Sequence, residues 1–247
     1  MREDLKCEII FKREIAPNQI EFILKNKRLA EEARPGQFVH IAIENGANIL
    51  RRPISICDSF MENTRIIFEI KGEGTKWLAS REEGDVLTLM GPLGNGFTQY
   101  PGKRAFVIGG GIGTFPLYKL TKMLDKPEIF LGFRNKDMVV MEQEFSMAGN
   151  LHIATDDGSY GHHGFAIELA EKEIDKCDVI YACGPKPMLK AVKALAEKYG
   201  KKAELSMEER MGCGIGACLV CVCKTTTGNR QVCLQGPVFD SEEVVLD

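Results

Sequence analysis

The spacing of four cysteines near the C-terminus constrains this 247-residue chain more than any other feature. The pattern C-x4-C-x2-C-x11-C is formed by Cys213, Cys218, Cys221 and Cys233. It matches the thiolate ligand spacing of a plant-type [2Fe–2S] cluster. Glycines between the ligands let the backbone wrap closely around a cluster and direct N–H groups at its sulfurs; these are Gly212, Gly214 and Gly216. The sequence therefore predicts a segment that binds one cluster and transfers single electrons.

A fifth thiol, Cys223, forms a C-x-C pair with Cys221 and is an alternative ligand. We favour Cys221 because its spacing from Cys218 fits the cluster pattern. An alternative of another class is a structural zinc site. Zinc sites favour two C-x2-C pairs separated by a longer interval, and only one such pair is present here.

Composition excludes several classes of function. The chain is 44% hydrophobic and 27% charged, which is typical of a soluble globular protein. A net charge of −3 gives no reason to expect a nucleic-acid partner. No apolar run approaches the roughly 18 residues of a membrane span, and the N-terminal residues lack an apolar signal segment. Nine cysteines then favour metal or redox chemistry over disulfides. We expect a cytoplasmic protein.

Residues 1–100 read as an all-β domain. Short β-branched runs recur between turn residues, and such spacing indicates a small barrel or sandwich. The expected strands are Cys7–Lys12, Gln19–Leu24, Gln37–Ile43, Arg65–Lys71 and Val86–Met90.

Residues 101–205 read as an α/β domain. Strands alternate with helices from Arg104–Ile108 to the expected last strand, Val179–Ala182, which the helix Pro187–Tyr199 follows. Strict alternation indicates a doubly wound parallel sheet. Residues 206–247 remain as a third segment, too small for a core of its own without a metal.

Two loops of the α/β half indicate a dinucleotide. The first is a glycine loop between a strand and a helix, where a pyrophosphate can meet close backbone and free N–H groups. The second follows the expected last strand, on the same edge of the sheet. From these loops we expect contacts from Gly109, Gly110, Gly111, Gly113, Thr114, Cys183, Gly184, Pro185 and Met188.

A third loop, Asp156–Ser159, bears on the choice of dinucleotide. A carboxylate beside the adenine ribose accepts hydrogen bonds from its hydroxyls and repels a 2′-phosphate. We assign this role to Asp157, which favours NAD over NADP. A solvated Asp-Gly turn is the alternative interpretation.

The β half carries features that suit a flavin. Arg51-Arg-Pro-Ile-Ser-Ile56 places guanidinium groups beside an apolar, hydroxyl-bearing segment. The turn Gly72–Thr75 opens a short helix about twenty residues later. Surface arginines are the alternative interpretation. A flavin would also connect the other two carriers, because it exchanges both hydrides and single electrons.

The order of these motifs resembles the ferredoxin–NADP reductase superfamily. The resemblance rests on Arg52–Ser55, Gly72–Thr75, Gly109–Thr114, Cys183–Pro185 and the C-terminal cysteines with Gly236–Asp240. It covers nearly the whole chain and is most similar to one branch, the electron-transfer subunits of NAD-dependent dihydroorotate dehydrogenase type 1B. The segment Thr114-Phe-Pro is bulkier than that branch would suggest.

The resemblance implies an antiparallel β-barrel FAD domain, an NAD domain and a small [2Fe–2S] segment. It implies one FAD per chain, held by Arg52, Pro53, Ile54, Ser55, Ile67, Phe68, Glu69, Gly74 and Thr75. We expect Ser55 to donate a hydrogen bond near flavin N5 and Cys183 to lie near the nicotinamide. The four histidines, including His40, are assigned no role.

The resemblance also implies a partner. An FMN-containing catalytic subunit would oxidise dihydroorotate to orotate in pyrimidine biosynthesis, in a heterotetramer of two such pairs. This chain would then be an oxidoreductase subunit that carries the electrons through [2Fe–2S] and FAD to NAD⁺. The nearest alternative is the small subunit of an NADH-dependent ferredoxin:NADP oxidoreductase. In that relative an Asp resembles the first cluster ligand, whereas Cys213 holds the place here.

Overall fold

The computed structural model describes residues 3–44, 46 and 49–246. Six of its strands close into an antiparallel barrel in the order β1-β2-β5-β4-β3-β6, which decides between the barrel and sandwich predictions. Closure is achieved because β1 pairs with both β2 and β6. The bounds are β1 Leu5–Ala16, β2 Gln19–Lys25, β3 Phe38–Ile41, β4 Arg52–Phe60, β5 Asn63–Glu69 and β6 Val86–Leu93, with helices α1 Lys27–Glu32 and α2 Glu73–Ala79.

A seven-stranded sheet follows in the order β10-β9-β8-β7-β11-β12-β15. The strands are β7 Ala105–Gly110, β8 Glu128–Phe133, β9 Asn150–Thr155, β10 His162–His163, β11 Val179–Cys183, β12 Lys202–Ser206 and β15 Val238–Asp240. The helices that cover it are α3 Phe115–Thr121, α4 Glu142–Ala148, α5 Ala166–Lys172 and α6 Lys186–Tyr199.

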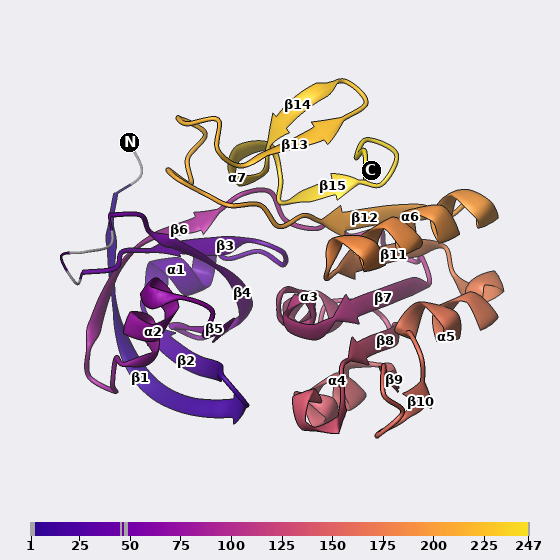
Figure 1. Ribbon diagram of the computed structural model, residues 1–247, viewed down its shortest axis with the longest axis horizontal. Helices are drawn as coiled ribbons and strands as arrows, with labels where there is room; N and C mark the ends of the chain where they lie inside the picture. Colours follow the sequence, from indigo (N-terminus) through magenta and orange to yellow (C-terminus); the bar gives the residue numbers. More distant parts are fainter. Residues whose placement is uncertain (1–2, 45, 47–48, 247) are drawn as a thin grey trace.

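Alternate residues of the central strand β7 enter two separate cores. Phe106 and Ile108 pack with α5 and α6, whereas Ala105 and Val107 pack with α3 and α4. The helices therefore cover both faces of the sheet, as Figure 1 shows, and the predicted doubly wound arrangement is confirmed.

The expectation that Val179–Ala182 is the last strand is wrong. The strand β12 pairs parallel to β11, and β15 then pairs antiparallel to β12. The left-handed Gly200 ends α6 and lets the chain return along the sheet, where Ala203 and Leu205 become fully buried. Because β15 lies beyond the fourth cysteine, the C-terminal segment returns to the sheet after forming its loop.

The C-terminal segment adds only a two-stranded sheet and one turn of helix, namely β13 Val222–Thr225, β14 Gly228–Gln231 and α7 Val232–Gln235. Its buried side chains join the core that covers one face of the large sheet, and Phe38 of the barrel belongs to the same core. In Figure 1 the segment lies above both the barrel and the sheet. It therefore depends on both for its hydrophobic contacts.

The barrel is joined to the helices of the sheet by polar contacts. Lys122, which caps the C-terminus of α3, contacts the buried Asp58 at 2.6 Å, and Arg65 contacts Glu144 of α4 at 3.5 Å. These pairs fix the two large parts against each other. No helix among the described residues is long and apolar enough to cross a membrane.

Candidate functional site

A cavity of about 780 Å³ lies where the barrel, the carboxyl edge of the sheet and the start of the C-terminal segment meet. The two barrel strands β4 and β5 form one wall, and the loops after β7 and β11 form another. Such a volume is typical of a cavity that binds a cofactor or a drug-sized ligand.

The barrel wall contains most of the side chains expected to bind a flavin. The cavity is lined by Pro53, Ile54, Ser55, Ile67, Phe68, Glu69 and Thr75. Arg52 and Gly74 do not line it but lie against each other beside it, so that a Cβ added at Gly74 would clash with the Arg52 guanidinium. The Thr75 hydroxyl accepts from the backbone N–H of Lys71 at 2.9 Å. The arrangement fits a flavin in the cavity with its phosphates toward Arg52.

The sheet wall is built from the two glycine-containing loops. Gly110, Gly111 and Gly113 line the cavity together with Cys183, Gly184, Pro185 and Met188. The loops pack so closely that a Cβ at Gly113 would stand 2.5 Å from the Cys183 carbonyl oxygen. Small residues are therefore required where a dinucleotide would approach the backbone.

Three expected NAD contacts lie outside the cavity lining: Gly109, Thr114 and Asp157. Thr114 is fully buried and donates its hydroxyl to the Gly111 carbonyl at 2.9 Å, so its side chain stabilises the loop. The Asp157 carboxylate accepts from the Ser159 hydroxyl at 2.6 Å and from its backbone N–H, and these bonds lower its pKa. Its neighbour Asp156 lines the cavity instead.

Cys183 lies at the end of β11, beside Ser206 of β12. Burial raises the pKa of its thiol to about 12, although the Ser206 hydroxyl opposes the shift. The thiol is therefore protonated near neutral pH. It can contact or orient a ligand in the cavity, but it does not supply a thiolate.

One wall of the cavity is not marked by any motif of the sequence. The linker from the sheet to the cysteine loop contributes Ser206, Met207, Glu208, Glu209 and Met211. No motif marks these residues, because they line the cavity only once β12 joins the sheet. Phe165 and Arg134 were missed for the same reason, since they reach the cavity from the ends of neighbouring elements.

The four predicted cluster ligands form two pairs. Cys213 and Cys218 are half-buried, and the Cys218 Sγ accepts from the Cys213 N–H at 3.3 Å. Cys221 and Cys233 are buried, and the Cys221 Sγ accepts from the Cys233 N–H at 3.4 Å. A two-iron cluster with four cysteine ligands matches this division. No three His, Cys, Asp or Glu side chains of the described chain are grouped to hold a single metal ion.

Backbone N–H groups surround the thiol sulfurs. The Cys213 Sγ accepts from Ile215, Ala217 and Cys218, at 3.2–3.5 Å. Burial acts to raise the pKa of this thiol, but the donors outweigh it and lower the pKa to about 7. Such donors stabilise thiolates and tune a bound cluster. The loop therefore fits the cluster that the sequence predicts.

Cys223 does not belong to either pair. It lies on β13, where it pairs in register with Arg230. Its side chain is buried in the core that covers the sheet, and burial raises its pKa. This placement favours a packing role.

The barrel, the doubly wound sheet and the cavity between them define the class of protein, a flavoprotein reductase of the ferredoxin–NADP reductase fold. The NADH-dependent reduced ferredoxin-NADP oxidoreductase structure superposes with a TM-score of 0.88 at 28% identity, covering 98% of this chain and 90% of that one. The cytochrome b5 reductase domain of Ulva prolifera nitrate reductase shares the fold, with a TM-score of 0.65 at 19% identity over 80% of this chain and 93% of that one.

Sequence comparison identifies a family within this class of flavoprotein reductases. Residues 208–245 match the family model "Iron-sulfur cluster binding domain of dihydroorotate dehydrogenase B". The electron transfer subunit of dihydroorotate dehydrogenase B (NAD(+)) from Bacillus caldolyticus is 45% identical over 98% of both chains, and that from Enterococcus faecalis strain V583 is 42% identical over 99% of both. The chain belongs to this family of electron transfer subunits, and the resemblance inferred from sequence is confirmed.

Proposed function

We propose that this chain carries electrons from a dihydroorotate-oxidising partner subunit through a [2Fe–2S] cluster and FAD to NAD⁺, in pyrimidine biosynthesis. The partner is an FMN-containing catalytic subunit, and two copies of each form a heterotetramer. The oxidation of dihydroorotate takes place on the partner. NAD is preferred over NADP.

The single observation that carries the proposal is the continuity of the cavity with the cysteine loop. The flavin strand, the dinucleotide loops and Met211 line one cavity, and Cys213 lies two residues beyond Met211. Two residues span at most about 7 Å of chain. The cluster ligands therefore begin within a short electron-transfer distance of the cavity wall.

The residues of the cavity have distinct tasks. Bound FAD supplies the exchange between hydride and single-electron chemistry. Ser55 lines the barrel wall and would donate a hydrogen bond to the flavin, and the protonated Cys183 lines the opposite wall and would orient the nicotinamide. Asp156 replaces Asp157 as the acidic residue that would face the adenine ribose.

The alternative is the small subunit of an NADH-dependent ferredoxin:NADP oxidoreductase, and the structural similarity favours it. Identity to that structure is 28%, against 42–45% for the dihydroorotate dehydrogenase subunits. Cys213 at the first ligand position also favours the dihydroorotate dehydrogenase subunit, because an Asp resembles the first cluster ligand in the alternative.

Two measurements test the proposal. A visible spectrum of the purified chain should show flavin and iron–sulfur absorbance that bleach separately with dithionite; a colourless protein would indicate a structural zinc site. The chain copurified with its partner should then reduce NAD⁺ with dihydroorotate. Reduction of NADP⁺ by ferredoxin and NADH, without activity on dihydroorotate, would support the alternative.

We also propose domain boundaries and a cellular location for the protein. We place the FAD domain at residues 1–100, the NAD domain at 101–205 and the cluster domain at 206–247; β6 ends at Leu93 and β7 begins at Ala105. All nine cysteines are free, which supports a reducing compartment such as the cytoplasm.

A further inference from the structure

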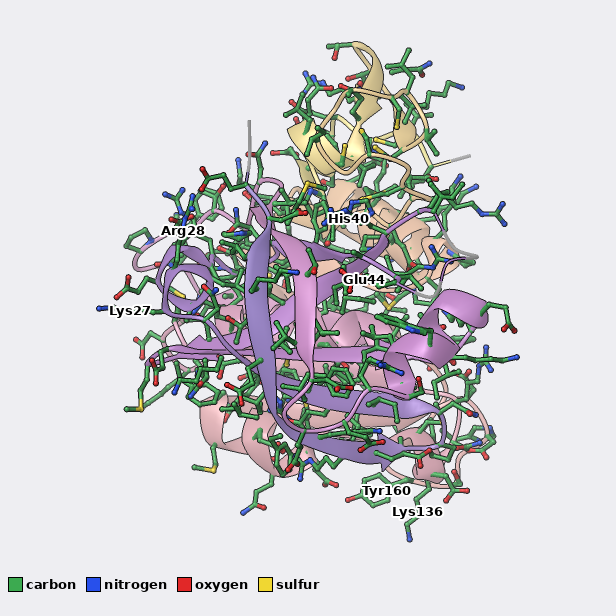
Figure 2. The ribbon with its side chains drawn as sticks, turned by 90° about the vertical axis from the view of Figure 1, so that its left-hand side faces the viewer. Lys27, Arg28, His40, Glu44, Lys136 and Tyr160 are labelled. Carbon is green, nitrogen blue, oxygen red and sulfur yellow. The ribbon has the colours of Figure 1, made fainter. Side chains whose placement is uncertain are left out.

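His40 lies on the barrel strand that supports the cysteine loop. Side chains alternate along β3, so Val39 and Ile41 enter the barrel core. His40 faces the other way and is fully buried beneath Gly214, where a Cβ would clash with its ring Nδ1. Figure 2 shows His40 between the barrel and the C-terminal segment. The ring therefore fills the joint between the two parts.

The ring nitrogens of His40 make no well-formed hydrogen bond among the described residues. Within the part of the chain that the structure describes, neither Nδ1 nor Nε2 makes a hydrogen bond, although both are buried. In either tautomer one of them carries a hydrogen, so at least one N–H lacks an acceptor. Buried polar groups of this kind are rare because they cost stability, and each one calls for a specific explanation.

The backbones of Cys213 and Arg51 lie close enough to the ring to act as acceptors and to raise its pKa against the effect of burial, although neither meets the geometry of a full hydrogen bond. Cys213 is the first predicted cluster ligand, and Arg51 immediately precedes the flavin strand β4. His40 is itself paired in register with Pro53, a residue of the cavity wall. The ring thus lies between the cluster loop and the segment that begins the flavin site.

We propose that His40 is a positioning residue that holds Cys213 against the flavin strand. In the cluster-loaded protein its ring N–H donates to the Cys213 backbone, which fixes the first thiolate relative to the barrel. Gly214 is required next to Cys213 because only glycine leaves room for the ring. This inference rests on the proposed function, since it concerns the loop that holds the cluster.

A pair of variants of similar size tests the proposal. His40→Asn keeps an N–H donor near the position of Nδ1, whereas His40→Leu removes it. Loss of groups that orient metal ligands typically costs 10–100-fold in metal affinity. We expect His40→Leu to release iron to a chelator about 10-fold faster than the wild type. We also expect it to broaden the electron paramagnetic resonance spectrum of the reduced cluster. His40→Asn should remain close to the wild type in both measurements.

Bound FAD serves as the control, because flavin content should stay stoichiometric in both variants. If His40→Leu fails to fold, His40→Phe keeps the ring volume without an N–H and should behave as predicted for Leu. Equal behaviour of the Asn and Leu variants would show that the ring only fills space, and would overturn the proposal. A wild-type protein with FAD but no cluster would instead overturn the proposed function, and this inference with it.

Discussion

The flavin cavity and the cysteine loop are built in opposite ways. The cavity lies between a closed barrel and a seven-stranded sheet, each with its own hydrophobic core. The cysteine loop belongs to a segment with one two-stranded sheet, and two of its predicted ligands, Cys221 and Cys233, are part of the core itself. The cavity is thus formed between two parts with cores of their own, whereas the segment is too small for its own core and packs against the sheet.

The four predicted cluster ligands differ in the same way. Cys221 and Cys233 are buried against the sheet, whereas Cys213 and Cys218 are half-buried. Burial raises the pKa of Cys233 to about 12, while N–H donors hold that of Cys213 near 7. One pair is anchored in the protein core and the other is held by loop backbone. We therefore expect a change in one region to leave the other intact.

The largest effect is expected from Cys221→Ser. Loss of one buried ligand should abolish stable cluster binding, because no other thiol pairs with Cys233 in the described structure. FAD should remain bound. Iron analysis measures the cluster content, and the visible spectrum measures the FAD and cluster contents. Cys223→Ser is the matched control and should retain the cluster; the reverse result would make Cys223 the ligand.

Ser55→Ala should slow flavin reduction by NADH about 100-fold, by analogy with the loss of a single donor at a reacting centre. FAD and cluster should both stay bound, since the strand β4 remains paired on both sides. Stopped-flow absorbance at the flavin band measures the rate. Ser59→Ala lies on the same strand outside the cavity lining and should reduce normally. Unchanged kinetics in Ser55→Ala would show that Ser55 does not assist flavin reduction through a hydrogen bond.

Gly74→Ala should weaken FAD binding about tenfold. The added Cβ displaces the Arg52 guanidinium, and a hydrogen bond to a charged group is worth about 1.5–3 kcal/mol. Gly72→Ala is the control, because nothing lies within 4 Å of a Cβ at that position. Flavin fluorescence on dilution measures release. Equal release from the two variants would argue against a role for Arg52 in holding the flavin.

The smallest effect is expected from Asn95→Ala. Its side-chain amide donates to the Gln235 carbonyl at 3.0 Å and fastens the barrel to the chain after Cys233. Its loss should destabilise the C-terminal segment by about 1 kcal/mol and leave the cavity intact. Hydrogen exchange should rise in residues 207–246 and not in the barrel strands. The exposed Asn229→Ala provides a control that should change neither region.

Motifs that depend only on neighbouring residues could be predicted from the sequence. The ligand spacing, the glycine loops and the strand–helix alternation are each encoded within a few neighbouring residues, and the cavity lining contains most of the side chains expected from them. The turn that ties Asp157 to Ser159, and the cavity position of Asp156 beside it, are visible only in three dimensions, and the role of Asp157 stays a prediction. The linker wall and His40 carried no sequence signal at all.

The sequence by itself determined the carriers and their order, because thiolate spacing and glycine turns depend on short stretches of chain. Tertiary structure decided how the carriers are joined. The pairing of β12 with β15 returns the C-terminal segment to the sheet, and this places Met211 at the cavity and the cysteine loop over His40. The contact of Gly214 with His40 joins residues more than 150 positions apart, and only the packing of the complete chain brings them together.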